Sequence, residues 1–156
     1  MLINKSQVLI FATLVLVGTS IVLVFVLGQE AAERAVLTVN DIDLPVRIAD
    51  NPWERKRGLA GYAAADIHAQ GMLFIFPDTK VREFWMKGME LDLDSLWIKD
   101  GIVVGLETKV LAPVAGQEPE RVTSSPIPVD MALELPAGYA AKFDLRPGVS
   151  LKVSLP

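Results

Sequence analysis

The chain has 156 residues, a formal net charge of −4 at pH 7 and no cysteine. This length allows one ordinary domain with a short appendage, and the lack of thiols excludes disulfides, thiol catalysis and cysteine metal sites. Residues 35–156 carry 13 Lys or Arg and 17 Asp or Glu. Because a mildly acidic domain without basic clusters binds nucleic acid poorly, we expect no nucleic-acid partner.

An apolar run, residues 8–27, dominates the amino terminus and contains no charged residue. As a helix it would span about 30 Å, the thickness of the hydrocarbon core of a bilayer. The sequence therefore predicts one transmembrane helix at about 8–27 and a short stem, so that residues 1–34 form a membrane anchor. A cleaved secretory signal is the alternative, although the apolar core of a signal usually has only about 7–15 residues.

The charges beside this run predict its orientation. Lys5 and the terminal amine precede the run, whereas Glu30, Glu33 and Arg34 follow it. The positive-inside tendency places the amino terminus in the cytoplasm and residues 35–156 on the periplasmic or extracellular side. We expect a single-pass membrane protein, or a secreted one if the segment is cleaved.

Short alternating or apolar segments, bounded by turn residues, recur after the anchor and predict about eight β-strands. Eight lie at residues 35–40, 42–49, 72–76, 84–86 with Val81 ahead, 96–98, 102–107, 129–135 and 149–155, and residues 121–124 would add one edge strand. The pairs Asn40-Asp41 and Asp100-Gly101 predict tight hairpin turns. Residues 129–135 alternate so cleanly that we expect a half-buried strand, with Ala132 and Glu134 on the face away from the apolar side chains.

Two short helices complete the predicted elements. Asn51 before Pro52 is typical of a helix start, and Gly58 ends this helix near Arg57. The second helix is predicted at residues 136–143. Residues 61–70 have the mixed composition of a loop. Many short strands with two brief helices predict a mainly β domain at 35–156, a jelly-roll-like sandwich or small barrel.

Several motifs give residues 37–153 a family resemblance. They are Arg57-Gly58-Leu59, Gly71-Met72-Leu73-Phe74, Phe84-Trp85-Met86-Lys87, Leu93-Asp94, and Leu133-Glu134-Leu135 with Ala137-Gly138. In this order they resemble the family known as domain of unknown function 192. The resemblance implies a mainly β, jelly-roll-like domain, often behind an export or anchor segment, and it implies no particular activity. Ala60 and Asp92 depart from the family's usual methionine and proline, which affects loop packing more than the fold.

Five residues near these motifs form the candidate ligand-binding set: Arg57, Trp85, Lys87, Asp94 and Glu134. Arg57 and Lys87 would present cations to a carboxylate, a phosphate or a sugar acid. Equally, Arg57 would fix its helix to the sheet by pairing with Asp94. Trp85 is expected to pack in a core, so that its truncation would be costly. The sequence predicts no catalytic residue, no metal site and no cofactor.

Other polar groups have structural explanations beside chemical ones. His68 is the single histidine, and no nucleophile motif lies near it. Glu90, Asp92 and Asp94 are spaced by two, as a carboxylate pair or an oxygen-rich cation site requires. A charged strand edge has the same spacing and protects against aggregation, so we expect the structural explanation here.

Met86 and Met89 have the spacing of soft copper(I) sites, but methionines beside aromatic residues usually fill a core. Two function classes stay open. We favour a non-enzymatic, monomeric, membrane-tethered envelope module that binds a small ligand, a glycan or a partner protein near Trp85. The alternative is a carboxylate-based hydrolase of the cell envelope with Asp94 and Glu134 as its acid and base.

Overall fold

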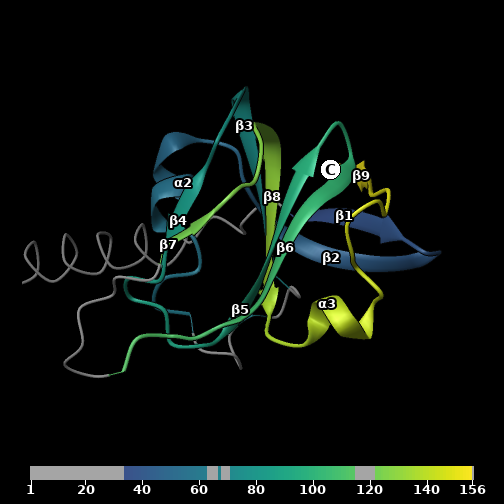
Figure 1. The fold of residues 1–156 in the computed structure, drawn as a ribbon. Coiled ribbons are helices and arrows are strands. Elements are labelled where there is room, and N and C mark those ends of the chain that lie inside the picture. Colours follow the sequence, from purple (N-terminus) through teal and green to yellow (C-terminus); the bar gives the residue numbers. More distant parts are fainter. Residues whose placement is uncertain (1–33, 63–66, 68–70, 115–121, 156) are drawn as a thin grey trace, which may run out of the picture. The chain divides into compact units, whose positions relative to one another are not determined.

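The computed structural model describes residues 34–62, 67, 71–114 and 122–155 (Figure 1). The strands of this part are β1 (Arg34–Val39), β2 (Ile42–Ala49), β3 (Met72–Lys80), β4 (Glu83–Trp85), β5 (Leu93–Lys99), β6 (Ile102–Val110), β7 (Val122–Ser124), β8 (Val129–Pro136) and β9 (Lys152–Ser154). The helices are α2 (Pro52–Arg57) and α3 (Tyr139–Lys142). No helix among these residues is long and apolar enough to cross a membrane, and the anchor predicted at 8–27 lies outside them.

Seven strands form one sheet in the order β6-β5-β8-β3-β2-β1-β9, and β4 and β7 form a separate antiparallel pair. Neighbours in the large sheet are antiparallel except β2 and β3, which run parallel. A parallel pair needs a crossover connection. Here α2 lies in the connection between β2 and β3, and Arg55 of this helix donates a hydrogen bond to the carbonyl of Ile75 in β3.

The large sheet curls until its two edges meet at one end, as Figure 1 shows. The amide of Val103 in β6 donates to the carbonyl of Val149 at 2.9 Å, and the amide of Leu151 donates to the carbonyl of Gly101 at 2.8 Å. These bonds join β6 to the segment just before β9, the strand at the opposite edge. The mainly β fold with two short helices is confirmed, but the sheet forms one curled half-barrel where a jelly-roll-like sandwich or small barrel was predicted.

Both predicted hairpin turns are confirmed. Asn40 and Asp41 have φ values of 48° and 61°, and Asp100 and Gly101 have 51° and 75°. Positive φ at both central residues is the type I′ geometry that matches the twist of antiparallel strands. The last predicted strand, at 149–155, is shorter in the structure because residues 149–151 bond to the β6 side instead of extending β9.

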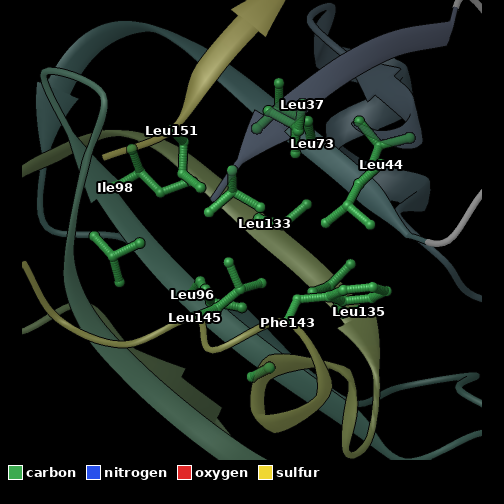
Figure 2. Packing of buried hydrophobic residues seen from close by; sticks show 14 of the residues in the cluster. Leu37, Leu44, Leu73, Leu96, Ile98, Leu133, Leu135, Phe143, Leu145 and Leu151 are labelled. Carbon is green, nitrogen blue, oxygen red and sulfur yellow. The ribbon is translucent and has the colours of Figure 1, made fainter. Parts of the chain in front are cut away.

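An aliphatic core, here called the inner cluster, fills the inside of the curl. Figure 2 shows leucines from several strands converging on Phe143 and Leu145, which follow α3. The cluster contains Ala35, Leu37, Val39, Leu44, Val46, Ile48, Leu73, Leu96, Ile98, Val103, Leu133, Leu135, Ala140, Phe143, Leu145 and Leu151. Since it draws on both edges of the sheet, this core holds the curl closed.

A second core, here called the outer cluster, covers the other face of the central strands. Its members are Ala49, Leu59, Met72, Phe74, Met86, Met89, Leu91, Leu93, Trp97, Val110, Val129 and Ala132. Because the outer cluster covers this face, the prediction that the strand at 129–135 is half-buried is wrong for its second half, which is buried on both faces. β8 lies between β5 and β3, and Ala132 and Glu134 are only 2% and 6% exposed.

Candidate functional site

A cleft opens on the outer side of β3, between α2 and β4. Its volume is about 460 Å³, and it is lined by Arg55, Lys56, Phe74, Phe76, Arg82, Glu83, Phe84 and Trp85. Phe74 meets Phe84 edge to face with ring centroids 4.7 Å apart, and Phe84 lies 5.3 Å from the ring of Trp97. The aromatic floor of the cleft is therefore continuous with the outer cluster, which fixes its shape.

The wall opposite β4 is α2, whose ends are set by local sequence. Asn51 caps the helix by accepting hydrogen bonds from the amides of Trp53 and Glu54 at 3.1 and 3.0 Å. Gly58 ends it with a φ of 53°, a value that L side chains rarely adopt. No residue of α2 is buried. Its basic last turn therefore presents its cations at the surface instead of using them in the core.

The two arginines of the cleft differ in their hydrogen-bond partners: Arg82 pairs with a carboxylate and Arg55 with neutral carbonyls. Arg82 pairs with Asp78, and its guanidinium lies 4.1 Å from the ring of Phe76. Hydrogen bonds from Lys80 and from Arg82 hold the pKa of Asp78 below its usual range. Arg55 instead donates from one nitrogen, Nη1, to the backbone carbonyls of Asp50 and of Ile75, the latter at 2.9 Å. Neutral carbonyls orient the guanidinium of Arg55 without cancelling its charge.

Trp85 stands at the rim of the cleft, and its residue is 55% exposed. The ammonium of Lys87 lies 5.7 Å from the centre of its ring, at the distance of a cation–π contact. The expected core position of Trp85 is therefore wrong: Trp97 is the buried tryptophan, at 1% exposure. The structure does bring Trp85 and Lys87 together, as the predicted site requires.

Arg57 lies elsewhere, in a stack of four side chains that we call the cation–π ladder. Its guanidinium lies 5.6 Å from the ring of Trp53 and 4.9 Å from the ring of Tyr62. Arg47 of β2 contacts the same tyrosine ring at 4.8 Å. Within the described part of the chain, neither Arg47 nor Arg57 forms an ion pair with a carboxylate. The predicted pairing of Arg57 with Asp94 is therefore not found.

Asp94 is a buried structural residue with 0% exposure. Its Oδ2 accepts hydrogen bonds from the amides of Gly138 and Ala140 at 2.8 and 2.9 Å, and its Oδ1 accepts one from the backbone amide of Lys109 at 3.0 Å. These bonds join β5 to the start of α3 and to β6. Asp92, by contrast, is exposed and accepts one bond, from the amide of Ala112 at 2.8 Å.

Glu134 is also buried, but on the opposite face of the sheet. In the register of β8 it lies beside Met72 of β3 and Ser95 of β5, whereas Asp94 lies beside Leu135. Successive side chains of a strand point to opposite faces, so the two carboxyl groups do not share a cleft. Burial raises the pKa of Glu134 to about 8 from its ordinary value of 4.5. The carboxyl group is therefore mostly protonated at neutral pH.

Comparison with known proteins agrees with this fold. The family model of DUF192, described as an uncharacterized ACR, matches residues 35–153. The chain belongs to the DUF192 family. No curated protein sequence matches it. A crystal structure of a proposed transcription regulator from Sinorhizobium meliloti 1021 superposes with a TM-score of 0.66 and 31% identity, covering 78% of this chain and 92% of that one.

A second crystal structure also resembles this DUF192 domain. It is a protein of unknown function from Novosphingobium aromaticivorans DSM 12444, with a TM-score of 0.61, 20% identity, and coverage of 76% of this chain and 83% of that one. At this identity the likeness concerns the fold alone. Both solved structures therefore share the overall fold of this domain.

The remaining sequence candidates fall into the core of the DUF192 domain or outside its described part. Met86 and Met89 are 3% and 7% exposed within the outer cluster, so the filling role expected for them is confirmed. His68 lies outside the described residues. Within the described residues, no group of three or more His, Asp or Glu side chains is placed to hold a metal ion.

Sequence reasoning missed the cations that line the cleft: Arg55, Lys56 and Arg82. The signal was present as three consecutive basic residues, 55–57, in a domain that is acidic overall. On a helix, residues two apart point in nearly opposite directions. Arg55 therefore faces the cleft, while Arg57 faces the cation–π ladder.

Proposed function

We propose that this DUF192 domain is a non-catalytic binding module whose cleft between α2 and β4 takes an anionic ligand with a flat or apolar face. The observation that carries this proposal is the guanidinium of Arg55. Two backbone carbonyls orient it at the wall of a cleft with an aromatic floor, and no carboxylate of the described residues forms an ion pair with it. An oriented, uncompensated cation in a cleft is an arrangement that recognises carboxylates and phosphates.

The size and lining of the cleft support the same proposal. Pockets for small molecules commonly have volumes of about 300–1,000 Å³ and apolar walls with a few placed polar groups. The cleft has about 460 Å³, an aromatic floor, and Arg55 and Lys56 on one wall. Arg82 pairs with Asp78, and Glu83 also lines the cleft, so the positive charge open to a ligand lies on the wall formed by α2.

No observation favours the carboxylate-based hydrolase. Its expected pair, Asp94 and Glu134, would need to face one cleft with separate pKa values. The carboxylate oxygens of Asp94 instead accept hydrogen bonds from three backbone amides, and Glu134 points to the other face of the sheet. The Sinorhizobium relative is named as a proposed transcription regulator, which raises a regulatory role as another candidate. The excess of 17 acidic over 13 basic residues in 35–156 opposes a role that needs direct binding of nucleic acid.

For the location of the module, we keep the proposal of an envelope protein held by an anchor at residues 8–27. The uncharged run and the preceding Lys5 support it. A reporter that is active only outside the cytoplasm, fused after Pro156, should be active, and the full-length mass should remain in the membrane fraction. A mature protein that begins near Gln29 would replace the anchor by a cleaved signal.

Calorimetry on the full chain in detergent tests the binding proposal. The ligands are ring-bearing acids, namely aryl carboxylates, aryl phosphates and uronic acids, with their uncharged amides or parent sugars as controls. We expect the acids alone to bind, and Arg55→Gln to weaken their binding about tenfold or more. Lys142→Gln is the matched control because Lys142 is an exposed helical cation stacked on Tyr139, away from the cleft. Equal losses in the two variants would contradict the assignment of the cleft.

A further inference from the structure

We infer that the ligand is an acidic polysaccharide chain, with one sugar acid in the cleft and the chain continuing over α2 onto the cation–π ladder. This inference rests on the proposed function of the cleft. It adds the ladder, formed by Trp53, Arg57, Tyr62 and Arg47, as a second binding surface for the same polymer.

The first argument is how α2 distributes its charge. The helix has six residues, and its last turn holds Arg55, Lys56 and Arg57. Arg55 and Lys56 line the cleft, whereas Arg57 lies in the ladder on the other side of the same helix. An α-helix with its side chains is about 10–12 Å across, so the two cationic surfaces are separated by roughly that distance. A single sugar acid cannot contact both, but a chain of such units can.

The second argument is the exposure of two tryptophans, one on each side of α2. Trp53 is 67% exposed at the end of the ladder, and Trp85 is 55% exposed at the rim of the cleft. In each case one cation, Arg57 or Lys87, lies over the indole ring. A large aromatic ring that stays exposed beside a cation is suited to a ligand with both apolar C–H faces and negative charges. Acidic sugars have this combination in every unit.

The third argument is the way the ladder holds its charge. Alternation of ring and guanidinium fixes Arg47 and Arg57 by stacking, and no carboxylate of the described residues pairs with them. Stacking on a ring face leaves the N–H groups of a guanidinium available to an anion. Arg57 is exposed and offers them directly, whereas the Nε of Arg47 is buried without a hydrogen-bond partner. Two such charges in a domain that is acidic overall form a local surface complementary to a polyanion.

Binding to galacturonate oligomers of increasing length tests the inference, with the full chain in detergent micelles and calorimetry as the readout. The wild-type protein should bind the hexamer at least about tenfold more tightly than the monomer, because the longer chain engages both surfaces at once. Fully methyl-esterified oligomers of the same length, which lack the charges, should not bind. Sulfated oligomers of equal length that bind more tightly would support a glycan chain and assign sulfate as its acid group.

Variants separate the two surfaces. Trp53→Ala and Arg57→Gln should abolish the gain from monomer to hexamer and leave binding of the monomer unchanged. Both side chains lie on a helix without buried residues, so the fold is retained. Arg55→Gln should weaken monomer and hexamer alike, whereas Lys142→Gln should change neither.

Each contrary result has its own meaning. If the hexamer binds no more tightly than the monomer and Arg55 is still required, the inference of a polysaccharide ligand is overturned and the proposed function of the cleft stays intact. Poly-glutamate that binds as tightly as the hexamer also overturns this inference, since the ligand would then be an acidic protein. If Arg55→Gln leaves binding of every acid unchanged, or if no acid binds, the proposed function itself fails.

Discussion

The two cores on either side of the sheet are built from different side chains. The inner cluster is almost entirely aliphatic, with Phe143 as its one aromatic member. The outer cluster contains Phe74, Trp97 and three methionines, and its aromatic rings continue into the floor of the cleft. One face of the same strands therefore closes the half-barrel, while the other supports a surface on which a ligand can bind.

The buried carboxyl groups repeat this contrast. Asp94, on the inner side, accepts three backbone hydrogen bonds and so replaces the water that it loses. Glu134, on the outer side, has a pKa raised to about 8 by burial alone. The first carboxylate stabilises the connection between strands and helix, whereas the second opposes folding once it is charged. Substitutions on the two faces should therefore have different consequences.

The largest effect is expected for Asp94→Ala. The substitution leaves the amides of Lys109, Gly138 and Ala140 without their acceptor, and each buried unsatisfied group costs about 1–3 kcal/mol. We expect a loss of roughly 3–6 kcal/mol in the free energy of unfolding, measured by urea denaturation. Asp92→Ala is the matched control and should cost about 1 kcal/mol, because this exposed residue accepts a single bond. Similar losses for both would show that the hydrogen bonds of Asp94 do not stabilise the connection of β5 to β6 and α3.

The two central tryptophans provide the next test. Trp97 is 1% exposed, so Trp97→Ala should cost about 3–5 kcal/mol through the cavity that it leaves. Trp85 is 55% exposed, and Trp85→Ala should change stability by no more than about 0.5 kcal/mol. Thermal or urea unfolding of both variants checks this. A large loss of stability in Trp85→Ala would show that Trp85 packs in the core and does not form the rim of the cleft.

Glu134 makes a pH-dependent contribution whose sign follows from its raised pKa. Between about pH 4.5 and 8 the unfolded chain releases the proton of Glu134 while the folded domain retains it, so stability falls as pH rises through this window. The change amounts to about 3 kcal/mol by pH 7 and about 5 kcal/mol above pH 8. Below pH 4.5 both states are protonated and the contribution is complete.

Glu134→Gln isolates this effect, because the amide keeps the shape and cannot be charged. As the pH rises from about 5 to 9, the wild type should lose stability relative to the variant, so the free energy of unfolding of the variant minus that of the wild type should increase. Urea denaturation at several pH values measures it, and other titrating groups cancel in the difference. A difference that stays constant across this range would mean that Glu134 is ionised in the folded protein.

Local signals in the sequence predicted much of the fold. The Asn-Asp and Asp-Gly turns and the cap at Asn51 each act through neighbours in the chain, and each is found as expected. Gly71, within one of the family motifs, has a physical reason as well. A Cβ atom there would lie 2.2 Å from the carbonyl oxygen of Glu134, so the motif preserves the close approach of the chain to β8.

The candidate site was harder to predict because it depends on which face of each strand is covered. Alternation in β8 showed that Glu134 is on the face opposite Leu133, but only the three-dimensional arrangement shows that a second core buries that face. The exposure of Trp85 follows from its place in the separate β4–β7 pair, a long-range pairing that local patterns do not reveal. Arg55 became a candidate only when its two carbonyl partners were known.

The smallest effect is expected for Lys87→Gln. Its ammonium lies over the exposed ring of Trp85, and an exposed cation–π contact contributes only about 0.5–1 kcal/mol. Arg82→Gln serves as the comparison and should be more destabilising, because the side chain of Arg82 is only 21% exposed, pairs with Asp78 and covers the ring of Phe76. Urea denaturation should show the greater loss for Arg82→Gln. If Lys87→Gln destabilised the domain as much as Trp97→Ala, the rim at Trp85 would belong to the core, and the outer face would no longer offer a surface free to bind a ligand.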